Sequence, residues 1–97
     1  MKVLYSPQLN ENDVLEYEFI GDKIIASYNG EVDEFDFTDM PDGFANGGGR
    51  NPNIISTLPF CPIIEARKTD GVLYVTMIKF ISSNASEKEK FPDWIDV

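Results

Sequence analysis

Carboxylates crowd one stretch of this sequence, between Glu31 and Asp42, where acids alternate with apolar residues. Closely spaced carboxylates can exchange protons with a substrate or bind a hard cation. Alternation along a β-strand, however, sends Asp33 and Asp36 to opposite faces of a sheet. The spacing of Asp36, Asp39 and Asp42 also differs from that of an EF-hand loop. We therefore interpret this stretch as a solvated acidic surface and predict no metal site in it.

A glycine run, Gly47–Gly49 followed by Arg50, is the second stretch with potential chemistry, because glycine-rich loops can bind phosphates. A phosphate loop ends in Gly-Lys-Ser or Gly-Lys-Thr and leads into a helix, whereas Asn51-Pro52 follows here. We predict instead a flexible surface loop over residues 43–53 that binds no nucleotide.

The usual pairs of catalytic side chains are missing from the sequence. It contains no histidine and one cysteine, Cys61, which excludes Cys-His pairs, Ser-His-Asp triads and histidine-ligated metals. Cys61 lies among Phe60, Pro62 and Ile63, a context typical of a small buried apolar side chain rather than a reactive thiol. We expect a protein that is not an enzyme and needs no cofactor.

Composition narrows the class of partner. The 97 residues include 17 acids and 8 bases, a formal net charge of −9, and 42% are hydrophobic. A chain of this length and hydrophobicity is expected to fold as one domain, 1–97, with a single core. Nucleic acids and anionic membranes are bound by clustered Lys and Arg, so we expect neither as a direct partner. No signal peptide or membrane-spanning run is readable, which favours an intracellular protein.

Three strand-like runs predict an antiparallel meander: Val14–Ile20, Lys23–Asn29 and Glu31–Phe37. They are separated by Gly21-Asp22 and Asn29-Gly30, which suit the two-residue turns of β-hairpins. Pairing the runs across both turns collects large apolar side chains on one face: Leu15, Tyr17, Phe19, Ile24, Ala26, Tyr28, Phe35 and Phe37. The other face collects polar ones: Glu16, Glu18, Lys23, Ser27, Glu34 and Asp36, interrupted by Ile25 and Val32. A register slip of one residue would break this partition.

A second hairpin is predicted over Ile63–Ile81, with Asp70-Gly71 as its turn. Counting outward from the turn places Ile64 opposite Met77 and puts Ile63 on the other face. The second strand of this hairpin is apolar on both faces, which is typical of a strand that is covered on both faces and central in the fold.

Shorter elements are predicted elsewhere. Lys2–Tyr5 has the composition of a first or edge strand that ends at Ser6-Pro7, and Asn53–Leu58 that of a short strand. Ser83–Lys90 is typical of a short helix with Asn84 as its N-cap. The sequence thus predicts a mainly β fold, in which a meander and a hairpin pack as a small sandwich or roll with a short C-terminal helix.

Two groups of residues are candidate sites for binding a partner. Four acids share the polar face of the meander and would suit a basic partner: Glu16, Glu18, Glu34 and Asp36. The alternative is that this face is kept polar to prevent aggregation. Phe91 and Trp94 either dock the C-terminal segment on the sheet or stay exposed for a partner.

Several short motifs follow one another in a recognisable order: Met40-Pro41-Asp42-Gly43, Thr57-Leu58-Pro59, Pro62-Ile63-Ile64, Asp70-Gly71-Val72-Leu73-Tyr74-Val75 and Phe91-Pro92-Asp93-Trp94. In these the chain resembles a group of small proteins encoded by phages and prophages of Gram-positive bacteria. The resemblance covers most of the chain but lies in turns and strands, and the group has no assigned activity. It implies a phage gene product that is present in the host cytoplasm or in the virion.

The leading hypothesis is a non-enzymatic phage accessory or structural protein, associated with the tail or virion, that acts through protein–protein contacts. The alternative is an acidic inhibitor of a host anti-phage defence complex, which imitates nucleic acid or blocks a basic groove. Both predict a protein partner, from the phage or from the host, and no direct contact with nucleic acid or membrane. A homo-oligomer is compatible with either.

Overall fold

Strands dominate the computed structural model, which describes residues 1–46 and 58–97. In chain order, the elements are β1 Lys2–Leu9, β2 Leu15–Ile20, β3 Lys23–Tyr28, β4 Glu31–Asp36, β5 Gly43–Asn46, β6 Ile63–Thr69, β7 Val72–Ile81, α1 Glu87–Lys90 and β8 Ile95–Asp96. The prediction of a mainly β fold with a short C-terminal helix is therefore confirmed.

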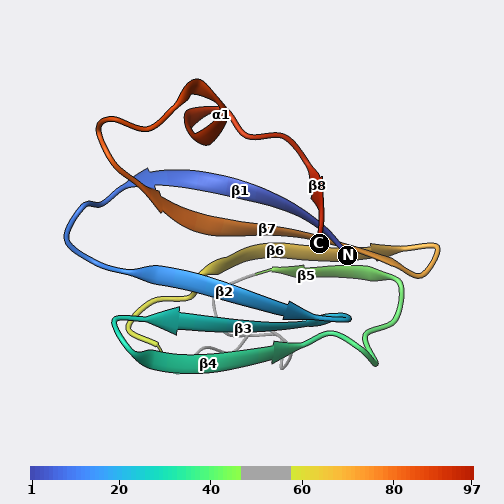
Figure 1. Ribbon diagram of the computed structural model, residues 1–97. Helices are drawn as coiled ribbons and strands as arrows, with labels where there is room; N and C mark the ends of the chain where they lie inside the picture. The colour runs from blue at the N-terminus through green and yellow to red at the C-terminus, as the bar shows by residue number, and fades with distance from the viewer. Residues whose placement is uncertain (47–57) are drawn as a thin grey trace.

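The strands form two sheets that face each other (Figure 1). One is antiparallel with the order β2-β3-β4, and the other is mixed with the order β5-β6-β7-β1-β8. The buried apolar residues of both sheets and their connections form one core: Val3, Ile24, Ala26, Phe35, Phe37, Met40, Leu58, Ile63, Ala66, Leu73, Val75 and Met77. Of the two predicted packings, sandwich and roll, the structure adopts the sandwich.

The meander has the predicted register. Its pairs include Phe19 with Ile24, Tyr17 with Ala26, Leu15 with Tyr28, and Ile24 with Phe35. Asn29 and Gly30 have φ values of 49° and 88°, the left-handed conformation that a type I′ hairpin turn requires. Because this conformation is restricted to few residue types, Asn-Gly fixes the turn and the turn fixes the pairing.

The second hairpin contains a β-bulge that the sequence pattern did not predict. Ile63 pairs with Met77 and Glu65 with Thr76, so Ile64 is the extra residue. Ile63 is 1% exposed and Ile64 42% exposed. The prediction that Ile64 faces Met77 was therefore wrong, because a bulge changes by one residue which side chains point to each face.

The N-terminal strand lies inside the five-stranded sheet, parallel to β7. A strand ending at Ser6-Pro7 was expected, but β1 continues to Leu9. β8 pairs antiparallel with β1 at Lys2 and Val3. Beyond these two residues β1 has no partner opposite β7 among the described strands, and such an edge position tolerates a proline.

Two further predictions are corrected. The N-cap of α1 is Ser86, whose hydroxyl accepts a hydrogen bond from Glu89 N at 3.3 Å, and not Asn84. The loop predicted over residues 43–53 begins with a strand, because Gly43–Asn46 is β5 and pairs with β6. The rest of that loop lies outside the described residues. So does the strand predicted over Asn53–Leu58, except for Leu58, which is buried in the core.

Candidate functional site

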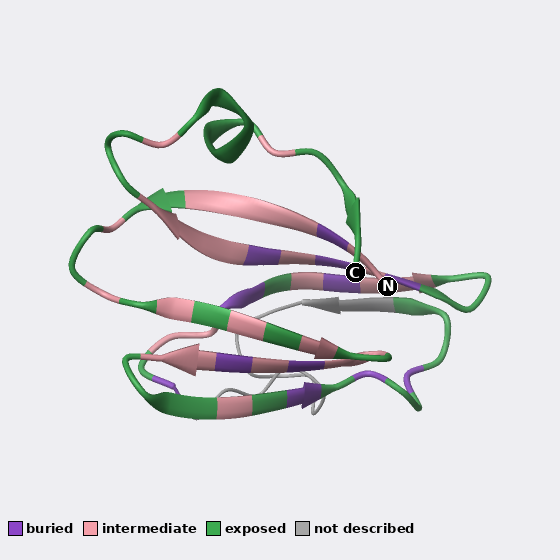
Figure 2. Ribbon diagram, in the orientation of Figure 1, coloured by how far each residue is buried: buried purple, intermediate pink, exposed green. Residues whose placement is uncertain are grey.

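The outer surface of the three-stranded sheet carries all four acids that were predicted to bind a partner. Successive side chains of a strand point to opposite faces, so the inward packing of Tyr17 and Phe35 turns their neighbours to solvent. β2 accordingly alternates between half-buried and exposed residues along its length (Figure 2). We call this surface the acidic face; its residues are Glu16, Glu18, Ile20, Lys23, Ile25, Ser27, Val32, Glu34 and Asp36.

The side chains of the acidic face form three rows across the strands. From β2 to β4 the rows are Glu16-Ser27-Val32, Glu18-Ile25-Glu34 and Ile20-Lys23-Asp36. Neighbouring strands lie about 4.8 Å apart, so Glu18 and Glu34 stand roughly 10 Å from each other on either side of Ile25. A shallow hollow of about 230 Å³ lies here, lined by Ile25, Val32 and the acids of β2 among others. Val32 is 61% exposed. Ile25 therefore lies at the centre of the acidic face between two acids, and the exposed Val32 lies at the corner next to it.

Charge on the acidic face is unbalanced between its two edges. On the β4 side, the Nζ atom of Lys23 lies 3.3 Å from Glu34 Oε1. Asp36 Oδ1 accepts hydrogen bonds from the hydroxyl and the main-chain N–H of Thr38, which hold the pKa of Asp36 below its ordinary value. On the β2 side, neither acid forms an ion pair or hydrogen bond within the described part of the chain. The carboxylates of β2 are thus the ones available to a cationic partner.

The two aromatic residues near the C-terminus do not behave alike. Trp94 packs edge-on against Tyr74 on the outer face of the five-stranded sheet, with 5.6 Å between ring centroids. The guanidinium of Arg67 lies 4.8 Å from the Tyr74 ring and 6.0 Å from the Trp94 ring. Phe91 is 79% exposed. Of the two alternatives, docking on the sheet describes Trp94 and exposure describes Phe91.

A second hollow, of about 300 Å³, lies where β2 passes beside β1 and β7. We call it the edge hollow; it is lined by Tyr5, Leu15, Glu16, Tyr17 and Lys79. The Tyr5 and Tyr17 rings stack at 6.2 Å, Lys79 Nζ lies 4.9 Å from the Tyr5 ring, and the Tyr17 hydroxyl donates to the carbonyl of Ile78. Burial raises the pKa of both tyrosines, so they are neutral hydrogen-bonding groups. Sequence reasoning missed this hollow because Tyr5 reaches it through the parallel pairing of β1.

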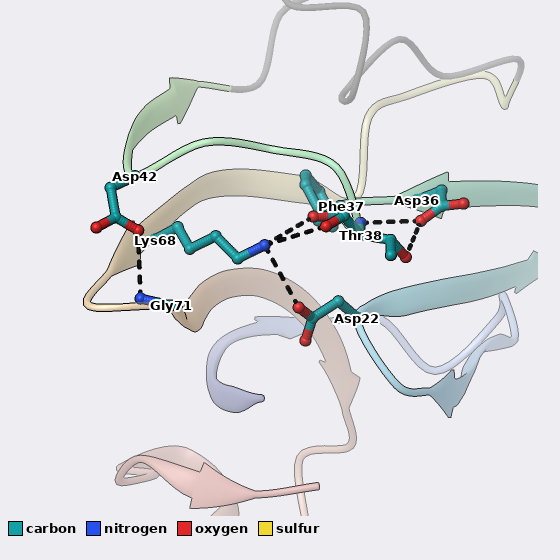
Figure 3. Close-up of polar contacts among 7 residues, drawn as sticks. All are labelled: Asp22, Asp36, Phe37, Thr38, Asp42, Lys68 and Gly71. Atoms are coloured by element: carbon teal, nitrogen blue, oxygen red, sulfur yellow. Dashed lines mark hydrogen bonds and ion pairs between the residues drawn. The ribbon is translucent and has the colours of Figure 1, made fainter.

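Lys68 is the second feature that sequence reasoning missed. Its side chain is 10% exposed, and its Nζ atom donates to the carbonyl oxygens of Phe37 and Thr38 at 3.3 Å each (Figure 3). Asp22 Oδ2 lies 3.6 Å from the same nitrogen. Lys68 belongs to β6, whereas its three partners belong to the β2–β3 turn and the segment after β4. The contact therefore joins the two sheets and is structural.

The cysteine and the carboxylates of the described residues are candidate reactive or metal-binding groups. Cys61 is half-buried, and its Sγ donates to the carbonyl of Ile63 at 3.4 Å. Among residues 1–46 and 58–97, no three Cys, Asp or Glu side chains are grouped so that they could hold a metal ion. The described helix is too short to cross a membrane. The acidic face and the edge hollow present charged and apolar side chains side by side.

Comparison of the chain with models of protein families, with curated proteins and with solved structures found no match. The candidate function therefore rests on the geometry of the two sheets. The acidic face and the edge hollow both adjoin β2, which makes this strand the centre of the candidate site.

Proposed function

We propose that the protein is a non-enzymatic binding module, a phage accessory or structural protein that contacts another protein through the acidic face. The apolar hollow at Ile25 and Val32, rimmed by Glu16 and Glu18, is the observation that carries this proposal. Protein interfaces combine an apolar centre with a polar rim, and this surface has the same arrangement. An outer face kept polar to prevent aggregation would need neither Ile25 at its centre nor an exposed valine beside it.

The partner in this proposal is basic. The chain carries a net charge of −9, and the two acids of β2 have no cationic neighbour among the described residues. Complementary charge accelerates encounter and selects among partners, whereas apolar contact at the centre provides affinity. The resemblance in turn and strand motifs suggests the setting, which is an infected bacterial cell, with the partner a phage tail or virion protein.

A second candidate function uses the same surface. The acidic face carries four acids and one base, and this excess of negative charge also suits an inhibitor that occupies the basic groove of a host defence complex. In that case the partner is a host protein. The two candidates share the site and differ in the identity of the partner, so they require a genetic test.

Site-specific photo-crosslinking tests the proposed site directly. Benzoylphenylalanine replaces Val32 on the acidic face or, as a matched control, the exposed Phe91 on the C-terminal segment. We expect a discrete adduct in infected cells from the probe at position 32. The adduct should disappear when Glu16, Glu18, Glu34 and Asp36 are all changed to lysine. An adduct formed from position 91 instead, and insensitive to the four acids, would contradict the proposal.

Infection with phage that carries the four charge reversals separates the two candidate functions. For an assembly or virion protein, particles should form poorly on every host. For an inhibitor, plaque formation should drop on hosts that have defence systems and remain normal on hosts that lack them. The isolated variant must keep its cooperative unfolding transition, because a misfolded protein would fail in both settings. Normal plaques on every host would refute both functions of this face.

A further inference from the structure

The main chain of β2 is open on the side away from β3. Asn29 N donates to Val14 O at 2.9 Å, one residue beyond the Leu15–Tyr28 end of the β2–β3 ladder, so the main chain of Val14 points toward β3. Hydrogen-bonded pairs alternate with non-bonded ones, so Glu16, Glu18 and Ile20 also direct their main-chain groups toward β3. The N–H and C=O groups of Leu15, Tyr17 and Phe19 therefore point away from it. No other strand in the described part of the chain pairs with them.

Two other open edges, those of β1 and β4, are protected. Beyond Val3, the open side of β1 includes Pro7, which has no N–H to donate. In β4 the N–H of Glu34 donates to the side chain of Asp33 at 2.8 Å. A proline and a side chain that occupies a main-chain donor are both ways in which sheets avoid pairing with foreign strands. Among these three edges, β2 is the one without such a device.

A strand placed beside β2 would meet different surroundings on its two faces. Toward solvent it would lie along the carboxylates of Glu16 and Glu18, which have no partner within the described residues. Toward the core it would lie over the edge hollow, whose walls include Tyr5 and Leu15. Lys79 and Glu16 both line this hollow, so its charges balance and its other walls are tyrosine and leucine. The side toward solvent carries two acids and no base on β2, so the basic residues of the added strand belong on that side.

We propose that β2 accepts an extended segment of the partner protein as a fourth, antiparallel strand of the sheet. The segment alternates Lys or Arg, which face Glu16 and Glu18, with aliphatic residues, which enter the edge hollow. In this geometry the residue opposite Tyr17 is aliphatic and exchanges both main-chain hydrogen bonds with it. The inference rests on the proposed function, since it specifies how a basic partner is held.

The test uses a synthetic peptide of alternating lysine and aliphatic residues, Lys-Leu-Lys-Val-Lys-Leu-Lys, labelled for fluorescence anisotropy. One control peptide carries N-methyl groups on its aliphatic residues, and a second carries them on its inner lysines. Antiparallel addition to β2 uses the N–H groups of the aliphatic residues. We therefore expect the first control to bind at least about tenfold more weakly and the second to bind as the parent does. Equal binding by all three peptides would overturn strand addition and leave charge-driven contact with the acidic face intact.

Two charge-matched protein variants locate the bound strand. Glu16→Lys/Glu18→Lys changes β2, and Glu34→Lys/Asp36→Lys makes the same change in net charge on β4. The first should weaken peptide binding by about tenfold or more and the second by no more than about twofold. Equal losses would place the peptide across the acidic face and refute docking at β2. Absence of parent peptide binding would also refute this inference, while the crosslink at position 32 tests the proposed function independently.

Discussion

Replacing Lys68 with methionine tests whether one partly buried lysine joins the two sheets. Methionine keeps the length and packing of the stem but removes the ammonium. In the variant, Phe37 O loses the hydrogen bond from Lys68 but keeps the one from Met40 N at 3.1 Å. Thr38 O also loses its hydrogen bond from Lys68. A hydrogen bond from a charged donor contributes about 1.5–3 kcal/mol, and these two are long. Adding a partly exposed ion pair with Asp22, we expect a loss of about 2–4 kcal/mol.

Urea unfolding at neutral pH measures this loss, and Lys79→Met is the matched control. Lys79 is a half-buried lysine on the neighbouring strand whose Nζ contacts a ring rather than carbonyl groups, so its replacement should cost no more than about 1 kcal/mol. The double variant with Asp22→Asn should show a coupling energy of about 0.5–1 kcal/mol with Lys68→Met. A cost below about 0.5 kcal/mol for Lys68→Met, or equal costs for the two lysines, would refute the reasoning.

Three further predictions concern the core, one carboxylate and the helix cap. Phe35→Ala should lower the free energy of unfolding by about 3–5 kcal/mol, because Phe35 is 1% exposed. The control Glu34→Ala should change it by no more than about 0.5 kcal/mol. Similar losses for the two variants in urea unfolding would contradict the register. Asp13 accepts hydrogen bonds from Asn10 and Asn29, which hold its pKa below its ordinary value. Its ionised form therefore stabilises the fold above about pH 4, and this stabilisation is lost as the pH falls through the lowered pKa. Asp13→Asn should therefore flatten the acid side of the stability profile, and an unchanged slope would disprove the assignment. Ser86→Ala should lower the free energy of unfolding by about 0.5–1 kcal/mol, because Ser86 is the N-cap of α1, and Asn84→Ala should leave it almost unchanged. A larger loss for Asn84→Ala would contradict the observed cap.

The parts of the fold that could be predicted are those set by neighbouring residues. Asn29-Gly30 adopts a turn open to few residue types, and a two-residue turn leaves one possible register for the strands on either side. The alternation of Glu16, Tyr17 and Glu18 then assigns the faces of β2. The four acids of the candidate site were located correctly for this reason.

The parts that escaped prediction depend on contacts between distant segments. Nothing near Lys2 indicates that it will pair with Tyr74, and the parallel direction of β1 follows from that pairing. The bulge at Ile64 adds one residue that no local pattern specifies. The edge hollow and the Lys68 contact arise where these distant segments meet, so half of the candidate site was invisible in the sequence.

The position of β1 between β7 and β8 also has a consequence for the order of folding. During synthesis β2, β3 and β4 can pair as soon as they emerge, since each follows its partner directly. β1 emerges before them, yet it must stay unpaired until β7 has been made. Closure of the five-stranded sheet is therefore a late and slow event, because contacts of long sequence separation form last. A chain interrupted before Val72 would expose the inner side of the meander, with Phe35 and Phe37 uncovered, and would be prone to aggregate.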